Sequence, residues 1–527
     1  MHYAVIFVLL LSFIFGLGLI ARRLSVPYPI LFVIGGLLIS FIPHLPRLAL
    51  DPDFIFFIFL PPLLYIQAFY TSWRDFRREL RPIALLAIGL VFATTVTVAY
   101  VAHWLIPDFP LAAGFVLGAI ISPPDAIAAS AIAQRLGLPR RVVTILEGES
   151  LINDSTSLVA FKISLIAVTT SAPLIGGAWL PGTFVYVSLG GIVVGLVVGK
   201  LVNWIRQYLI DDGAQIILTV SLLTPFTSYL VAEPLQVSGV LAVVTTGLYL
   251  GWESPAIMTS NIRLQAQAFW EMLIYLLNGI VFVLIGLQLP GILQGIAVYS
   301  WPQLLLYAFV INTTCILVRI GWVFPGAYTP FWISKCVRRR EIFPDWRQVF
   351  IISWSGMRGI VSLAAALALD GYAHFPRAHL VQFLAFSVIL TTLVFQGLTL
   401  PFLIRYLGVG DDGIAAQEEL EARNRMSEAV LEKIDEARRE EKFPNGVIDS
   451  IEQFYRERAL ALKDDLADQL GWSDKRHHVV NLRRMRHAMI STERHVLVNL
   501  RHTGIIGDDV MHKIEHELDL EEARLKI

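Results

Sequence analysis

Long apolar runs recur along the first three quarters of the chain, and they constrain the fold more than any other feature. A helix that crosses the hydrocarbon core of a bilayer needs about 20 mostly apolar residues. The 527-residue chain is 55% hydrophobic and only 16% charged, whereas soluble domains are roughly 25% charged. The sequence therefore predicts an all-α membrane protein that crosses the bilayer many times.

Thirteen runs are candidate spans, of which the second and the ninth are short. They cover approximately residues 3–21, 28–43, 53–70, 83–105, 111–134, 142–169, 181–204, 213–232, 236–251, 267–289, 300–323, 349–369 and 379–404. The first run has neither a basic leader nor a small-residue cleavage site, so we interpret it as a span and not as a cleaved signal. We expect thirteen transmembrane helices.

The basic residues of the loops predict the orientation. Lys and Arg accumulate in cytoplasmic loops near the helix ends. The odd-numbered loops contain Arg22, Arg23, Arg74, Arg77, Arg78, Arg81, Arg135, Arg140, Arg141, Arg206, Arg263, Lys335, Arg338, Arg339, Arg340 and Arg347. The even-numbered loops contain only Arg47 and Arg377. This alternation favours an N-terminus outside and a cytoplasmic C-terminal tail, in a multi-pass protein of the inner or plasma membrane.

The composition changes sharply near residue 409, which predicts two domains. Residues 1–408 hold the apolar runs and form the transmembrane domain. From Asp411 onward, 26 acidic residues stand against 19 basic ones, so we expect residues 409–527 to form an acidic, mostly helical cytoplasmic tail with a regulatory or dimer-contact role. Seven histidines lie in this tail, at positions 477, 478, 487, 495, 502, 512 and 516. They suit either a pH sensor or, more simply, a solvated charged surface.

Ionisable side chains inside the predicted spans are the candidates for function. Each costs roughly 2.5 to 3.5 kcal/mol at a helix centre, so such groups are paired, hydrated or functional. They are Asp125, Glu147, Glu149, Asp154, Lys162, Arg319 and Arg358. Structural ion pairs are the simpler alternative for any one of them. Lys162 is placed to reach the outer surface and Glu147 to be solvated.

The stretch ISPPDAIAAS predicts a break in the fifth span. Pro123 and Pro124 remove two backbone donors and clash with the preceding turn. Irregular backbone at membrane depth is tolerated where it lines a watery cavity or is covered by protein. The break frees carbonyl groups and places a helix N-terminus beside Asp125, which is a favourable arrangement for an ion site.

Two carboxylates are expected to meet at this break. Asp125 lies near the middle of the fifth span and Asp154 near the middle of the sixth, and a short basic loop joins the two spans. Ser150 lies four residues before Asp154 and shares its helix face. Carboxylate, hydroxyl and carbonyl oxygens are the ligands that hard cations prefer, so these three residues form a candidate sodium site.

The twelfth span has a second predicted interruption. In WSGMRGIVSLAAALAL, Gly356 and Gly359 flank Arg358, whose charge cannot be removed by deprotonation. Spans five and twelve are seven apart, which places them at equivalent positions of two inverted repeats. Paired interruptions of this kind indicate the binding site of a transporter. Glycine-mediated helix packing is the alternative explanation for span twelve.

These features predict exchange of a cation for a proton. Two nearby carboxylates in a partly desolvated pocket favour protonation, so a cation binding there competes with a proton. Alternate exposure of the site to the two sides of the membrane then gives antiport without a nucleotide or any other cofactor. Sodium is the expected cation, with potassium or broad monovalent cation exchange as the alternative. The other classes that we considered are an intramembrane aspartyl protease, whose expected sequence motifs are missing, and a passive channel.

Seven stretches resemble one known family in order along the membrane part. They are FFIFLPPLLYIQAF from Phe56, SPPDAIAA from Ser122, EGESLINDSTSLVAF from Glu147, VSGVLAVVTTGLYLG from Val237, FWEMLIYLLNGIVFVLIGLQL from Phe269, WSGMRGIVSLAAALAL from Trp354 and TLVFQGLTLPFLI from Thr392. Together they resemble the monovalent cation/proton antiporters, in the branch of bacterial sodium/proton exchangers. The tail stretch RHTGIIGDDVMHKIEHELDLEEARL is also similar to bacterial members.

The resemblance implies several further features. Spans 4–6 and 11–13 would form a mobile core, and spans 1–3 and 7–10 a scaffold on the dimer side, in a homodimer. It implies cation and proton binding at Asp154, with Asp125 and Ser150 as ligands, and a polar network of Glu149, Asn153 and Arg358. The Asn153-Asp154 pair resembles the electroneutral branch. No nucleic-acid partner is expected.

One departure from the family pattern affects the predicted site. Many relatives have Thr-Asp-Pro where this chain has Pro124-Asp125-Ala126. The threonine oxygen is therefore missing from the expected ligand set, which leaves the ligand number and the ion selectivity open.

Overall fold

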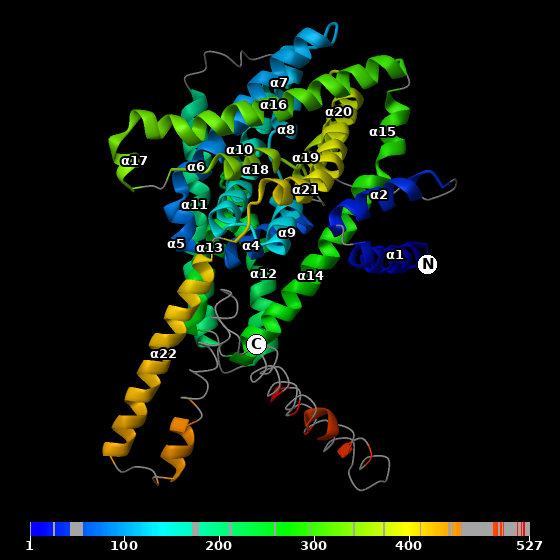
Figure 1. The fold of residues 1–527 in the computed structure, drawn as a ribbon. Helices are drawn as coiled ribbons and strands as arrows, with labels where there is room; N and C mark the ends of the chain where they lie inside the picture. Colours follow the sequence, from blue (N-terminus) through cyan, green and yellow to red (C-terminus); the bar gives the residue numbers. More distant parts are fainter. Residues whose placement is uncertain are drawn as a thin grey trace. The chain divides into compact units, whose positions relative to one another are not determined.

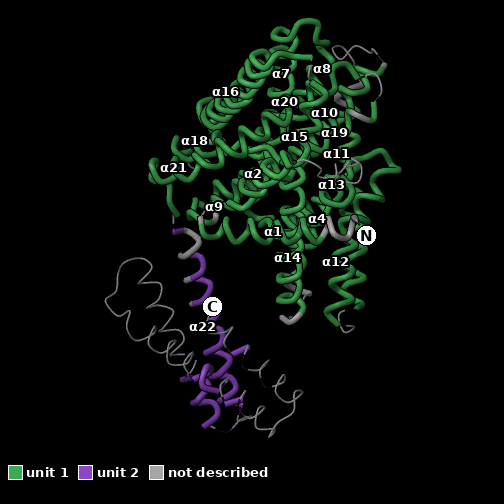
Figure 2. Tube along the Cα trace, turned by 90° about the vertical axis from the view of Figure 1, so that its right-hand side faces the viewer, with its two compact units in different colours: residues 1–411 green, residues 412–527 purple. Residues whose placement is uncertain are grey.

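The computed structural model describes most of the first 440 residues and isolated stretches beyond them. The described ranges are 2–24, 27–42, 56–170, 179–209, 213–257, 260–296, 298–340, 343–372, 375–411, 413–440 and 446–453, with single residues and short pieces as far as 521. The chain divides into two compact units, Met1–Asp411 and Asp412–Ile527 (Figure 2). All seven tail histidines singled out above lie outside the described residues.

The first unit is a bundle of helices, and its described residues form no strand (Figure 1). The helices of its first half are α1 (His2–Leu24), α2 (Tyr28–Ser40), α4 (Leu60–Tyr70), α5 (Trp73–Arg78), α6 (Leu80–Ala84), the π-helix η1 (Leu85–Leu90), α7 (Val91–Leu105), α8 (Leu111–Ile121), α9 (Ala126–Leu136), α10 (Arg140–Thr170) and α11 (Trp179–Tyr208). Those of its second half are α12 (Ala214–Ala232), α13 (Gly239–Ile257), α14 (Ser260–Leu287), α15 (Leu289–Gly295), α16 (Trp301–Ile333), α17 (Lys335–Arg340), α18 (Trp346–Trp354), α19 (Ile360–Leu367), the 3-10 helix η2 (Ala368–Gly371), α20 (Ala378–Leu390), the π-helix η3 (Thr391–Gln396) and α21 (Gly397–Leu407).

Eight helical stretches within the described part of the chain are long and apolar enough to cross a membrane. They are Leu80–Leu105, Leu111–Ala133, Arg140–Thr169, Gly182–Tyr208, Ala214–Ala232, Ile262–Gly295, Trp301–Ile333 and Ala378–Leu407. Two shorter apolar helices, Tyr28–Ser40 and Phe56–Tyr70, coincide with predicted spans two and three. Predicted span twelve is divided between α18 and α19, so neither piece alone has the length of a span.

Both predicted interruptions are present. The chain leaves helical geometry between the end of α8 at Ile121 and the start of α9 at Ala126. It does so again between the end of α18 at Trp354 and the start of α19 at Ile360. The first break contains the two prolines and the second the two glycines, which are the residues that weaken a helix most.

Helices α2 and α14 pack backbone to backbone. A Cβ atom added to Gly36 would overlap the carbonyl of Val283, and one added to Gly286 would overlap the carbonyl of Val33. Small residues allow this close approach, which is a common way to hold helices together in lipid, where apolar surface alone gives little attraction. The two helices are therefore held at short range by van der Waals contact along their length.

The second unit contains one long described helix, α22 (Ile414–Arg439). Ion pairs at i,i+4 run along its surface, between Glu419 and Arg423 and between Glu421 and Arg425. Lys433 donates a hydrogen bond to Glu436, which raises the pKa of the Lys433 ammonium and lowers the pKa of the Glu436 carboxyl. Charges on all sides are typical of a solvated helix stabilised by such pairs.

Candidate functional site

Asp125, Ser150 and Asp154 line one cavity of about 380 Å³, part of which is open to solvent. Its other polar side chains are Gln67 of α4 and Ser362 of α19. Apolar residues, among them Leu60, Leu63, Leu64 and Ile360, complete the wall. The two carboxylates and the hydroxyl that the sequence predicts to form a cation site therefore face the same space between α4, the first break, α10 and the second break.

Helix α10 holds the first break in place. The side-chain amide of Asn153 donates to the carbonyl of Pro124 over 2.8 Å. The Ser150 hydroxyl accepts a hydrogen bond from the backbone N–H of Ala126 over 3.3 Å. Backbone groups that the broken helix cannot pair are thus satisfied by side chains of the neighbouring helix, as buried polar groups require. Pro123 lines the cavity itself.

Asp125 sits at the N-termini of two half-helices. One of its carboxylate oxygens, Oδ1, accepts the backbone N–H of Ile127 over 2.8 Å at the start of α9. A Cβ atom on Gly359, the residue before α19, would overlap the same carboxylate. The backbone N–H of Asp125 donates to the carbonyl of Met357 over 2.6 Å, and this hydrogen bond joins the two breaks directly. The second carboxylate oxygen, Oδ2, is buried and accepts no hydrogen bond from the described residues.

Arg358 places a positive charge at helix C-termini, whereas Asp125 places a negative charge at helix N-termini. Arg358 is 1% exposed, and its Nε donates to the carbonyl of Ile121, the last residue of α8, over 3.1 Å. Its Nη1 also donates to the carbonyl of Gly356. A helix C-terminus carries partial negative charge and an N-terminus partial positive charge. The buried arginine and the partly buried aspartate each lie at helix ends of the opposite sign.

Each member of the predicted polar network of Glu149, Asn153 and Arg358 has a hydrogen-bond partner outside that group of three. Glu149 forms a double hydrogen-bonded ion pair with Arg319 of α16, with Nη1–Oε1 and Nη2–Oε2 distances of 2.6 and 2.8 Å. Both partners are 1% exposed. Arg319 also donates from Nε and Nη2 to the carbonyl of Ile352, over 3.3 and 3.0 Å. Asn153 and Arg358 bond to backbone carbonyls at the first break, those of Pro124 and Ile121.

Two further contacts at the breaks, one polar and one of packing, were not predicted. Thr392 of η3 accepts the backbone N–H of Arg358 over 3.1 Å. Gly356 packs against Arg319, because a Cβ atom there would lie 2.6 Å from the arginine Cδ. The sequence indicated that Arg319 is buried, but periodicity alone gives no information on which helix supplies its partner.

The remaining charged candidates, Lys162 and Glu147, do not line this cavity. Lys162 is exposed on α10, as expected for a side chain that reaches the membrane surface, and Glu147 is half-buried. Within the described part of the chain, no three His, Cys, Asp or Glu side chains gather into a metal-binding cluster. Cys315 is buried and free.

Comparison with known proteins identifies the family. The family model "Sodium/hydrogen exchanger, transmembrane" matches residues 9–406. An uncharacterised Na(+)/H(+) exchanger of Mycobacterium tuberculosis (strain ATCC 25618 / H37Rv) is 36% identical over 515 residues, which is 96% of this chain and 93% of that protein. The sodium, potassium, lithium and rubidium/H(+) antiporter of Bacillus subtilis (strain 168) is 36% identical over 413 residues, 75% of this chain and 61% of that protein.

A solved structure has the same fold. The sodium proton antiporter MjNhaP1 from Methanocaldococcus jannaschii at pH 8 matches with a TM-score of 0.56 at 20% identity, over 75% of this chain and 100% of that chain. The family model and the M. tuberculosis relative both extend through the two breaks and the cavity between them. The chain therefore belongs to the sodium/hydrogen exchanger family of multi-pass membrane transporters, which exchange cations for protons.

Proposed function

We propose that the protein exchanges sodium for protons by alternating access, with Asp154 and Asp125 binding both ions in turn. The observation that carries the proposal is that both carboxylates and the Ser150 hydroxyl line one cavity at the two helix breaks. The buried Oδ2 of Asp125 accepts no hydrogen bond from the described residues, so its lone pairs are available to a cation. Such oxygen ligands suit a hard monovalent ion.

The proposed cycle is a competition between ions for these oxygens. Two carboxylates that share a small, largely apolar cavity repel each other when both are ionised, which favours protonation of at least one of them. Sodium binding neutralises this repulsion and releases a proton, and the reverse exchange occurs on the other side of the membrane. Asn153 stands where a second acidic residue would add charge beside Asp154, so we infer electroneutral exchange of one sodium for one proton.

The remaining parts of the architecture follow from the same proposal. Thirteen spans in two inverted repeats place the N-terminus outside and residues 409–527 in the cytoplasm of a plasma or inner membrane. Spans 4–6 and 11–13 form the mobile core and the others the scaffold of a homodimer. The close backbone contact of α2 and α14 supports the idea that this pair moves as a rigid part of the scaffold.

Transport in sealed vesicles tests the site. Purified protein is reconstituted into vesicles with a preset pH gradient, and sodium is then added. We expect sodium to dissipate the gradient, and we expect Asp154→Asn to abolish this, since the amide neither releases a proton nor carries charge. Asp108→Asn, at an exposed loop position, is the matched control and should transport normally. Unchanged sodium-dependent flux in Asp154→Asn would contradict the assignment.

Broad monovalent cation exchange is the second candidate. Pro124 replaces the threonine that many relatives have beside the first aspartate, so one oxygen ligand that could discriminate between ions is missing. The B. subtilis relative is named as an antiporter of sodium, potassium, lithium and rubidium. An ion panel in the same vesicles separates the two candidates: sodium exchange predicts strong preference for sodium over potassium, and broad exchange predicts similar apparent affinities.

A further inference from the structure

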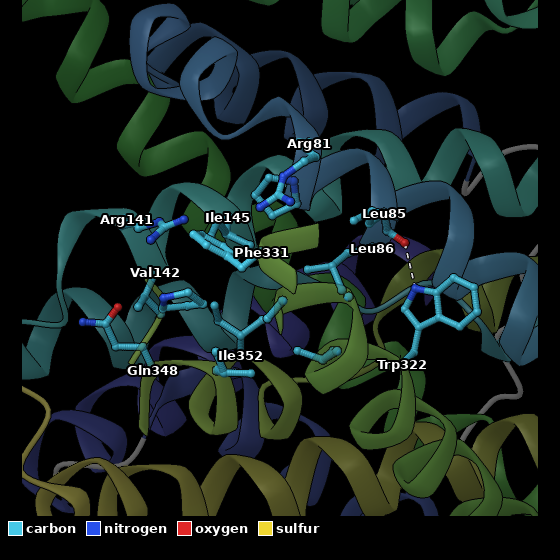
Figure 3. Close-up of a pocket in the computed structure, with 16 residues that line it drawn as sticks. Arg81, Leu85, Leu86, Arg141, Val142, Ile145, Trp322, Phe331, Gln348 and Ile352 are labelled. Atoms are coloured by element: carbon cyan, nitrogen blue, oxygen red, sulfur yellow. Dashed lines mark hydrogen bonds between the residues drawn. The ribbon is translucent and has the colours of Figure 1, made fainter. Parts of the chain in front are cut away.

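A second cavity lies away from the carboxylates, between α6, η1, α10, α16 and the start of α18 (Figure 3). It has a volume of about 630 Å³, which includes space that is open to solvent. The residues that line it are Arg81, Pro82, Leu85, Leu86, Arg141, Val142, Ile145, Trp322, Val323, Gly326, Ala327, Phe331, Pro344, Gln348, Val349 and Ile352. None of them belongs to the cation site.

Its charged side chains are both arginines. The guanidinium of Arg81 lies over the ring of Phe331, 5.6 Å from the ring centre. Arg141 is bonded to Glu79 over 3.1 Å and is 27% exposed. The surrounding segments 73–81 and 140–141 contain six arginines against only Asp75 and Glu79. These two segments therefore carry more basic than acidic side chains.

One helix N-terminus lies beside the arginines. Val142 lies in the first turn of α10, and a helix N-terminus carries partial positive charge, which favours anions. The start of α18 is instead capped by the Asp345 carboxylate, which accepts the backbone N–H of Arg347. The arginines and the start of α10 thus favour a negatively charged group at one end of the ligand.

Most of the remaining wall is apolar, and Gln348 is its other polar side chain. Trp322 contributes its ring while its indole N–H donates to the carbonyl of Leu85 over 3.0 Å, so the polar atom of the side chain is already satisfied. At the end of α16 near the cavity, Trp332 and Ile333 are 74% and 80% exposed. An exposed aromatic residue beside a basic segment is typical of the membrane interface.

The cavity also contacts the polar interior. The carbonyl of Ile352, a lining residue, accepts two hydrogen bonds from Arg319, which is the partner of Glu149. Ile145 of the wall precedes Glu149 by one helical turn. A molecule in the cavity would therefore contact the three helices that these bonds join. The ion pair joins α10 to α16, and the hydrogen bonds of Arg319 join α16 to α18.

We propose that this cavity binds one anionic phospholipid from the leaflet on the basic side of the protein. Its phosphate lies at Arg81 and Arg141, and one acyl chain lies along Leu85, Leu86, Trp322 and Ile352. Basic pockets between transmembrane helices are suited to acidic lipid head groups, and basic residues are attracted to anionic leaflets by about 1 kcal/mol each. Occupancy stabilises the packing of α10, α16 and α18 against one another.

Lipid retention tests the head-group contacts independently of transport. Protein purified in detergent is incubated with phosphatidylglycerol or phosphatidylcholine, and bound lipid is counted by native mass spectrometry. We expect one phosphatidylglycerol per protomer to be retained preferentially. Arg81→Gln/Arg141→Gln should weaken its binding roughly 30-fold, equivalent to about 2 kcal/mol, whereas Arg81→Lys/Arg141→Lys should retain it. Arg77→Gln/Arg78→Gln, which removes two exposed arginines of the same segment that do not line the cavity, should bind normally.

A pair of glycines in α16 tests the acyl-chain contacts without changing charge. Gly326 lines the cavity and Gly321 does not. At both positions an added Cβ atom would meet no atom within 4 Å. Gly326→Leu should therefore fill the cavity and displace the lipid. Gly321→Leu, the same substitution in the same helix, should leave lipid binding unchanged.

Three results would overturn the proposal. The first is equal retention of phosphatidylglycerol by the wild type, the double glutamine variant and Gly326→Leu. The second is equal loss in the Arg77→Gln/Arg78→Gln control, which would assign the binding to general surface charge. The third is that inorganic phosphate alone raises the thermal unfolding temperature as much as phosphatidylglycerol does. This result would make the cavity a simple anion site. Since none of these measurements requires ion flux, they are independent of the proposed sodium exchange.

Discussion

At the scale of single residues, several charged side chains in the interior of this protein have specific local partners. Asp125 lies at the N-termini of α9 and α19, and Arg358 at the C-terminus of α8. Glu149 and Arg319 neutralise each other. Burial of an ion without a partner costs several kcal/mol, so these pairings explain how charge is tolerated at membrane depth.

The Glu149–Arg319 pair should behave as one unit. We expect Glu149→Gln to destabilise the protein by about 3 to 5 kcal/mol, because it leaves the guanidinium of Arg319 buried without its counter-charge. Glu149→Gln/Arg319→Gln should be less destabilised than the sum of the two single variants, since no unpaired charge remains. Thermal unfolding in detergent gives the comparison. Additive effects would show that the two side chains do not depend on each other.

Gly359 should be intolerant of even one methyl group. Gly359→Ala places a Cβ atom on the Asp125 carboxylate, so the half-helix or the aspartate must move. We expect cation-dependent proton flux to fall at least about tenfold, since small displacements of reacting groups cost this much or more. Gly371→Ala, where a Cβ atom meets nothing within 4 Å, is the matched control. Equal flux in the two variants would show that this close approach is unimportant.

At the scale of elements, the sequence predicted the irregular parts of the membrane domain better than its contacts. The prolines at 123 and 124 and the glycines at 356 and 359 identified both breaks, because these residues act through local backbone chemistry. The partner of Arg319 could not be predicted. It lies 170 positions away in the chain, and a hydrophobic pattern indicates which face of a helix is buried but not against which neighbour.

The π-helix η3 has a measurable role that the sequence did not reveal. It places the Thr392 hydroxyl where it accepts the backbone N–H of Arg358. Thr392→Val keeps the shape and removes the acceptor, so we expect a loss of about 1 to 3 kcal/mol from the buried, unpaired donor. Thr391→Val, in the preceding position of the same element, should cost less than about 1 kcal/mol. Chemical or thermal unfolding of both variants distinguishes them; equal stabilities would contradict the assigned hydrogen bond.

At the scale of the whole membrane unit, one hydrogen bond joins the helix of the cation site to a helix of the proposed scaffold. Ser155 of α10 and Ser238 at the start of α13 lie 2.6 Å apart between their hydroxyl oxygens, and both are buried. Under the proposed alternating access, α10 moves relative to α13, so this contact must break and reform during each cycle.

A reversible cross-link tests that motion. The Ser155→Cys/Ser238→Cys variant should form a disulfide on oxidation. The two hydroxyl oxygens are 2.6 Å apart, so sulfur atoms at these positions need only small shifts to reach the length of a disulfide bond. We expect oxidation to lower the exchange rate at least tenfold and a thiol reductant to restore it, as expected if a lock on the motion blocks a required step. Each single cysteine variant controls for modification of one thiol. Full activity of the cross-linked protein would exclude relative motion at this contact.

The ion pair between α10 and α16, together with the two bonds from Arg319 to the backbone of α18, has a further consequence for turnover. Because these contacts hold the three helices together, we expect the helices to move as one body under the proposed alternating access. Displacements of such groups of helices take microseconds to milliseconds. The proposed exchange should therefore carry one ion per cycle, at a rate far below that of an ion channel.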